Sequence, residues 1–157
     1  MNFTDICNEW KNNGRLPVVS GITYCDGYVD RIYIEFDKDN NYKRTIVKEG
    51  RIDIDSLSAN EKKYGFSHVG TFCEVSNKEN NINVYCGGGS YGGEGFIVVE
   101  SNEKIIWIAF FTESNEFLRC EIVENSIIAY NNSREKWVFD IDNPSDFSIH
   151  ELYSNPR

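Results

Sequence analysis

The chain has 157 residues, of which 40% are hydrophobic, and carries a net charge of −9. This length is typical of a single domain, and the composition is that of a globular protein, which excludes an intrinsically disordered chain. The longest apolar run, residues 105–111, is far shorter than the roughly 20 residues of a membrane helix. Because the N-terminus also lacks the pattern of a signal peptide, we expect a soluble, cytoplasmic, single-domain protein.

The negative charge is concentrated in the second half of the chain. Residues 1–78 contain 11 basic and 12 acidic residues, whereas residues 79–157 contain 5 basic and 13 acidic residues, a net charge of −8. Such a surface repels a phosphate backbone, so we expect no direct binding of nucleic acid or of an anionic membrane. An acidic surface instead favours a basic protein partner, or serves solubility alone.

Residues 3–13 are predicted to form one short amphipathic helix. Their apolar side chains fall on one helical face at i, i+3, i+4 and i+7: Phe3, Ile6, Cys7 and Trp10. Asn2 or Thr4 supplies an N-cap oxygen, and Gly14 is a typical residue at a helix C-terminus. We expect this helix to dock through its Trp10 face.

The rest of the chain, about residues 16–153, reads as short strands separated by Asn, Gly, Ser and Asp clusters. The predicted strands are residues 16–24, 28–36, 42–48, 51–54, 66–75, 81–86, 95–100, 104–111, 117–123, 126–131, 136–141 and 147–152. A helical turn is expected around residues 58–63. The connections are too short for the crossover helices of a parallel sheet. The predicted fold is therefore mainly β, an antiparallel β-sandwich or barrel of about ten to twelve short strands with one N-terminal helix.

Strand 104–111 is apolar on both faces, which predicts a central strand that is covered on both sides, in part by the N-terminal helix. Its neighbour, strand 117–123, alternates between apolar and polar residues. We expect the following residues in or beside the core: Ile106, Trp107, Ile108, Phe110, Leu118, Cys120, Ile122, Trp137 and Phe139.

Two loops resemble ligand-binding motifs but lack their defining residues. The glycine-rich residues 87–95 have neither the lysine nor the following helix of a phosphate-binding loop, so we interpret them as a flexible hairpin connection. Residues 37–41 begin like a calcium loop, but Tyr42 and Lys48 stand where that motif requires glycine and glutamate. Neither loop predicts a ligand.

Catalytic and metal-binding signatures are also missing from the sequence. The histidines, His68 and His150, both lie in predicted strands. Residues 88–92, Gly-Gly-Ser-Tyr-Gly, match the letters of the G-x-S-x-G motif but lack its context, because a nucleophile elbow requires a helix after the serine and a predicted strand follows here. The five cysteines form no C-x-x-C pair, so we expect reduced, structural thiols at Cys7, Cys25, Cys73, Cys86 and Cys120. The sequence therefore predicts no catalytic residue, no bound metal and no cofactor.

One region resembles a known class of proteins. Within residues 105–149 the chain contains I-I-W-I-A-F-F-T-E-S-N-E-F, then E-I-V-E-N-S-I-I-A-Y-N-N-S and W-V-F-D-I-D-N-P. These stretches are similar to segments of small cytoplasmic bacterial immunity proteins, encoded beside contact-dependent or Rhs/WapA-type polymorphic toxins. The resemblance implies a non-catalytic protein that binds the C-terminal domain of a cognate toxin, a basic protein, and neutralises it by surface complementarity.

If that function holds, the acidic second half is the expected binding surface. Opposed charge accelerates the capture of a basic partner, and an aromatic residue supplies short-range binding energy. The predicted partner-binding residues are Glu113, Glu116, Glu121, Glu124, Asp140, Asp142 and Asp146, with Tyr130 as the anchor. The alternatives are a cytoplasmic β-sandwich that acts as a ligand-binding or adaptor domain without a toxin partner, and a small enzyme. A further alternative is that the carboxylates serve only to keep the protein soluble.

Overall fold

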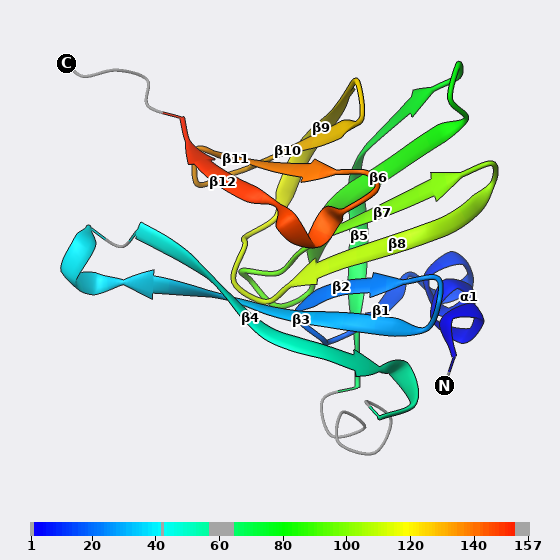
Figure 1. Cartoon of the computed structure of the whole chain (residues 1–157), viewed down its shortest axis with the longest axis horizontal. Coiled ribbons are helices and arrows are strands. Elements are labelled where there is room, and N and C mark those ends of the chain that lie inside the picture. Colours follow the sequence, from blue (N-terminus) through cyan, green and yellow to red (C-terminus); the bar gives the residue numbers. More distant parts are fainter. Residues whose placement is uncertain (1, 42, 57–64, 153–157) are drawn as a thin grey trace.

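A computed structural model describes residues 2–41, 43–56 and 65–152 of the chain. The fold is mainly β, with twelve strands in two antiparallel sheets and one N-terminal helix, arranged as a curled half-barrel (Figure 1). The predicted fold class is confirmed. The predicted helical turn at residues 58–63 lies outside the described residues.

Helix α1 (Phe3–Asn13) has the predicted bounds. The Asn2 side chain accepts a hydrogen bond from the backbone N–H of Asp5 at 2.9 Å, and the Asp5 carboxylate accepts one from the N–H of Asn2 at 3.0 Å. This reciprocal capping satisfies two N–H groups at the start of the helix. Gly14 ends the helix in the left-handed conformation, with φ +62°.

The larger sheet contains eight strands in the order β1-β5-β6-β7-β8-β2-β3-β4, and the smaller sheet contains four in the order β12-β11-β10-β9. Their bounds are β1 (Arg15–Pro17), β2 (Gly21–Tyr24), β3 (Tyr28–Asp37), β4 (Lys43–Asp53), β5 (Phe66–Asn77), β6 (Ile82–Gly89), β7 (Gly95–Ser101), β8 (Lys104–Phe111), β9 (Phe117–Val123), β10 (Ser126–Asn131), β11 (Glu135–Asp140) and β12 (Ser148–Glu151). All described strand pairs are antiparallel, as the short connections require.

The main core lies between the two sheets and is rich in aromatic rings. Trp107 and Phe111 of β8 face Trp137 and Phe139 of β11, with ring centroids 5.2 Å apart for Phe111 and Trp137. Phe147 stacks on Trp137 at 5.6 Å. The only polar atom of the Trp107 side chain is satisfied, because its indole N–H donates to the carbonyl of Ile141 at 2.9 Å.

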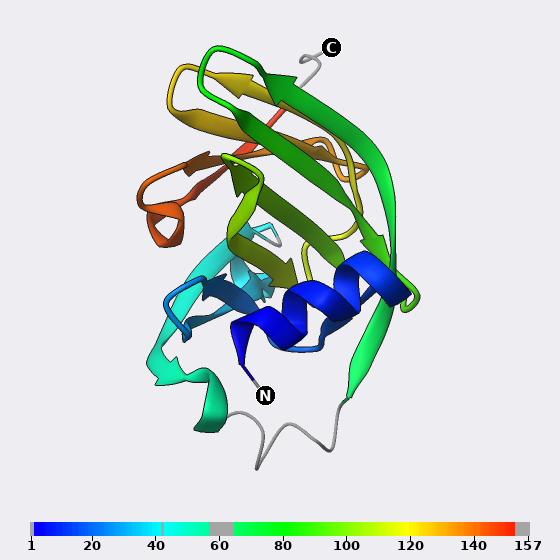
Figure 2. The same ribbon diagram turned by 90° about the vertical axis from the view of Figure 1, so that its right-hand side faces the viewer.

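A second core lies on the opposite face of the larger sheet, beneath α1 (Figure 2). Ile6 of the helix is buried in the same cluster as Val98 of β7 and Ile108 and Phe110 of β8. Trp10 contacts Tyr85 edge to face, with ring centroids 5.1 Å apart. Strand β8 is therefore covered on both faces, in part by the N-terminal helix, as its sequence predicts.

Two predicted strand boundaries are wrong. Residues 16–24 form two strands, β1 and β2, which lie apart in the larger sheet because the intervening residues carry the chain from β5 to β8. Residues 42–48 and 51–54, predicted as separate strands, belong mostly to the single strand β4. Gly50 adopts φ +95° beside a register shift in the β3–β4 pairing, so the chain bends there without ending the strand.

Two further expectations need correction. Leu118 is 46% exposed, because a register shift between β9 and β10 lets Phe117 take the inward position instead. The glycines at 87–89 lie within β6 and not in a hairpin loop. A Cβ atom on Gly88 would lie 2.4 Å from Cγ of Glu116, so glycine is required there because the β8–β9 connection crosses closely over β6.

Candidate functional site

The smaller sheet has one face against the core and one face, here called the outer face, that no described element covers. Pairing between its strands places the outward side chains in rows across the sheet. The first row is Arg119, Tyr130, Lys136 and His150; the second is Glu121, Ile128, Val138 and Ser148; the third is Val123, Ser126 and Asp140. All eleven side chains are exposed or half-buried. The outer face therefore has a basic row with one aromatic ring, a middle row in which Ile128 and Val138 are apolar, and an edge row that contains Val123 and Asp140.

Tyr130, the predicted anchor, is already engaged by its neighbours on the outer face. The Arg119 guanidinium carbon lies 3.7 Å from the centroid of the Tyr130 ring, and the Tyr130 hydroxyl donates to Glu121 at 2.7 Å. The hydrogen bond to Glu121 raises the pKa of Tyr130. Tyr130 therefore presents a partly covered ring, and Val123, 47% exposed at the edge of the same face, is the most accessible apolar side chain there.

Three of the predicted carboxylates, Glu124, Asp140 and Asp142, gather where the β9–β10 turn meets the end of β11. Together with Asn125 they form a region here called the acidic end. The Asn125 amide donates to Asp140 at 3.3 Å and to Asp142 at 2.9 Å. The Asp140 carboxylate also accepts the backbone N–H groups of Asp142 and Asn143. None of the ion pairs in the described part of the chain involves a carboxylate of the acidic end.

Asp146 lies on the same connection but is paired. It belongs to the short helix η3 (Pro144–Asp146), and its carboxylate is 2.7 Å from the Lys48 ammonium group of β4. The hydrogen bond from Lys48, followed by one from Asn143, lowers the pKa of Asp146. Asp146 therefore attaches η3 to the larger sheet and does not extend the acidic end.

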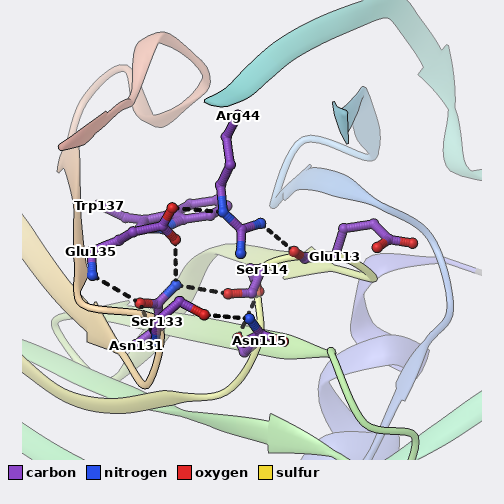
Figure 3. A network of polar contacts seen from close by, with 8 residues as sticks. All are labelled: Arg44, Glu113, Ser114, Asn115, Asn131, Ser133, Glu135 and Trp137. Carbon is purple, nitrogen blue, oxygen red and sulfur yellow. Dashed lines mark hydrogen bonds and ion pairs between the residues drawn. The ribbon is translucent and has the colours of Figure 1, made fainter. Parts of the chain in front are cut away.

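Glu113 and Glu116 lie in the β8–β9 connection, away from the acidic end. The Glu113 carbonyl accepts a hydrogen bond from Arg44, and the Glu113 side chain is exposed (Figure 3). Glu116 is half-buried and lies over Gly88. The structure thus divides the predicted binding residues among the acidic end, the outer face, the β8–β9 connection and the Lys48 pair.

The β8–β9 connection is held by a buried polar network that the sequence does not reveal (Figure 3). Arg44 and Glu135 form an ion pair at 2.7 Å, with only 5% and 9% of their side chains exposed. Asn131 donates to Glu135 at 2.7 Å and to the carbonyl of Ser114 at 2.8 Å. The Arg44 guanidinium also lies over the Phe36 ring at 4.5 Å. These contacts join the β3–β4 hairpin to the smaller sheet. They also satisfy the buried charge of the Arg44 guanidinium.

A second network of polar contacts, which the sequence does not reveal, joins η3 to the larger sheet. The Ser145 hydroxyl donates to Asp30 at 2.5 Å, and the Tyr24 hydroxyl lies 2.6 Å from the Ser145 oxygen. Arg51 donates twice to Asp30, at 2.7 and 3.2 Å, and these bonds lower the pKa of Asp30. A carboxylate with a lowered pKa is a weak base, so the arrangement suits a structural anchor better than proton abstraction from Ser145.

The cysteines are distributed unevenly. Cys25 is exposed and Cys7, a residue of α1, is half-buried, whereas Cys73, Cys86 and Cys120 converge between the two sheets. The expectation of reduced, structural thiols does not include this convergence, because the three residues lie on different strands and far apart in the chain. The histidines do not join them within the described residues.

No protein-family model matches the chain, and no curated protein matches it. Within the residues that the structure describes, no helix is long and apolar enough to cross a membrane. Function is therefore inferred from the geometry of the surface and of the buried polar groups.

Proposed function

We propose that the protein is a bacterial cytoplasmic immunity protein, which binds a basic toxin domain and neutralises it without catalysis. The observation that carries this proposal is the acidic end, where Glu124, Asp140 and Asp142 gather without a cationic partner among the described residues. It adjoins an uncovered sheet face. The resemblance of residues 105–149 to immunity proteins supports the same function.

The acidic end is suited to the first encounter with a basic partner. Its carboxylates are solvated and exposed, so they attract the partner over distance without first breaking an ion pair. Complementary charge of this kind raises association rate constants from about 10⁵–10⁶ to about 10⁸–10⁹ M⁻¹s⁻¹ at low salt. Fast association is what an inhibitor of a toxin requires.

The outer face is suited to the short-range contacts that follow. Val123, Ile128 and Val138 form its apolar middle and edge, and all three retain exposed surface. Tyr130 lies beside them, and tyrosine and arginine are the residue types most often found at binding hot spots. Arg119 already covers the Tyr130 ring, so the pair would contact a partner as one preformed unit.

The test is to mix the protein with the toxin domain encoded beside it and to measure association by stopped flow at several salt concentrations. The informative variant is Glu124→Lys with Asp142→Lys, because it leaves Asp140 and its backbone hydrogen bonds intact. We expect association to slow several-fold and its salt dependence to weaken, with the free energy of unfolding unchanged.

The matched control is Glu35→Lys with Asp39→Lys, which makes the same change in net charge on the exposed tip of the β3–β4 hairpin. The control should associate at nearly the unmodified rate. Equal slowing by both double variants would show that net charge alone drives association and would remove the acidic end as the binding surface. Failure of the unmodified protein to bind any adjacent toxin domain would favour the adaptor-domain alternative.

A further inference from the structure

Three cysteine thiols meet between the two sheets. Cys73 of β5 and Cys86 of β6 lie directly opposite each other in the larger sheet, and Cys120 of β9 faces them from the smaller sheet. Their Sγ atoms all lie within 4.8 Å of one another, and those of Cys73 and Cys120 are 3.9 Å apart. No other histidine, cysteine or carboxylate among the described residues joins this group.

A β-bulge creates the convergence. The β5–β6 pairing shifts register between Thr71 and Cys73, so Phe72 is the extra residue. Phe72 is 51% exposed, whereas Cys73 turns inward to meet Cys86. With regular alternation, Phe72 would oppose Cys86 and fill the space with a ring. The bulge thus exposes a large apolar side chain and brings a third thiol into the group. Bulges commonly redirect side chains beside functional sites.

We propose that Cys73, Cys86 and Cys120 form a three-coordinate site for a monovalent copper ion, Cu(I). Thiolate sulfur is a soft ligand and selects soft ions such as Cu(I). With metal–sulfur bonds of about 2.3 Å, three sulfurs around a central ion lie about 4.0 Å apart. The thiols need to move by less than about 1 Å from their present spacing to reach this geometry.

The number of donors distinguishes Cu(I) from zinc. A structural zinc site is tetrahedral and closed by four protein ligands. Here only three sulfurs converge, and Cys86 and Cys120 are buried among apolar side chains such as Phe117 and Ala129. Trigonal coordination satisfies Cu(I) without a fourth donor. Cys73, which is half-buried, provides the route by which an ion enters from solvent.

Binding exchanges protons for the ion and involves no change of oxidation state. One Cu(I) and three thiols give a copper tris-thiolate and three protons, which pass to solvent. Burial raises the pKa of Cys73, and a hydrogen bond with Cys86 together with burial raises that of Cys120. Because protons compete with the ion, the affinity for Cu(I) should rise as the pH is raised.

The test is an anaerobic titration of the whole, reduced protein with Cu(I), supplied as its acetonitrile complex, against the chelator bathocuproine disulfonate. We expect one ion per chain to be retained, with a thiolate-to-copper absorption band and a raised melting temperature. Cys73→Ser should lower the affinity by at least about a hundredfold, since changes outside the ligand set alone cost about 10–100-fold. Cys73→Ala serves the same purpose if the serine variant does not fold.

The matched controls are Cys25→Ser and Cys7→Ser, which remove thiols outside the group and should leave the affinity unchanged. Retention of Cu(I) by Cys73→Ser and Cys73→Ala, or its loss in Cys25→Ser, would overturn the site. So would complete transfer of copper from the unmodified protein to the chelator. Tight binding of Zn²⁺ in place of Cu(I) would overturn the assignment of the ion. None of these variants alters the acidic end, so the outcome is independent of the proposed toxin partner.

Discussion

The two sheets differ in how many of their faces are packed against other elements. In the larger sheet, β8 is packed on one side against the smaller sheet and on the other against the cluster beneath α1. In the smaller sheet, β10 is packed on one side only, and its outward residues Ser126, Ile128 and Tyr130 remain half-buried. Helix α1 covers only the larger sheet.

This difference separates residues that stabilise the fold from residues available to a partner. A substitution in β8 alters two packed layers at once, whereas an outward substitution in β10 alters side chains that contact solvent. We therefore expect substitutions in the larger sheet to lower the free energy of unfolding strongly, and substitutions on the outer face to lower it only slightly. The predictions below test this contrast.

The largest effect is expected from Trp107→Ala in β8. Trp107 is 2% exposed and its indole N–H is hydrogen-bonded, so its truncation leaves a cavity and an unpaired carbonyl at Ile141. The free energy of unfolding should fall by roughly 3–5 kcal/mol in urea denaturation. Leu118→Ala, at the exposed bulge of β9, should change it by less than about 0.5 kcal/mol. Similar losses in both variants would contradict the contrast.

An intermediate effect is expected where the β3–β4 hairpin meets the smaller sheet. Arg44→Leu leaves the buried carboxylate of Glu135 without its charged partner, and should lower the free energy of unfolding by roughly 2–3 kcal/mol. The double variant Arg44→Leu with Glu135→Leu should lose less than the sum of the two single variants, because no unpaired charge remains. Lys43→Leu, at the exposed neighbouring position, is the control and should be nearly neutral. Additive losses would show that the pair is not coupled.

The smallest effect is a pH dependence that depends on Asp30. Because Arg51 lowers the pKa of Asp30 in the folded protein, the ionised carboxylate stabilises the fold above its ordinary pKa of 3.8. That contribution disappears as the pH falls through the lowered value. Asp30→Asn should therefore reduce stability at pH 7 by less than about 1 kcal/mol, since Arg51 is half exposed, and should flatten the acid limb of the stability curve. An unchanged acid limb, compared with Asp39→Asn as control, would contradict the role of Asp30.

The same contrast explains what the sequence could predict. The cap residues and spacing of α1 are local signals, and the double-sided apolar pattern of β8 is visible in one stretch of eight residues, so both elements were predictable. The inward orientation of Phe117 and Cys73 was not predictable from the sequence, because bulges change the alternation of side chains without leaving a local signal. The exposure of Leu118 follows from one such shift.

The candidate sites depend on contacts between distant parts of the chain. The gathering of Glu124 with Asp140 and Asp142 follows from the pairing of β10 with both β9 and β11, which acidity alone does not indicate. The Asp146–Lys48 pair joins residues 98 positions apart, and the Arg44–Glu135 pair joins residues 91 positions apart. Pairing at such separations is set by strand order, which one sequence does not reveal.

Strand β4 has a further consequence for the behaviour of the protein at high concentration. It is the last strand of the larger sheet, and its eleven residues form a long edge. Exposed sheet edges invite pairing with other chains, and charged side chains or bulges oppose it. Lys43, Lys48 and Arg51 along β4, with the bend at Gly50, therefore protect the protein against edge-to-edge aggregation.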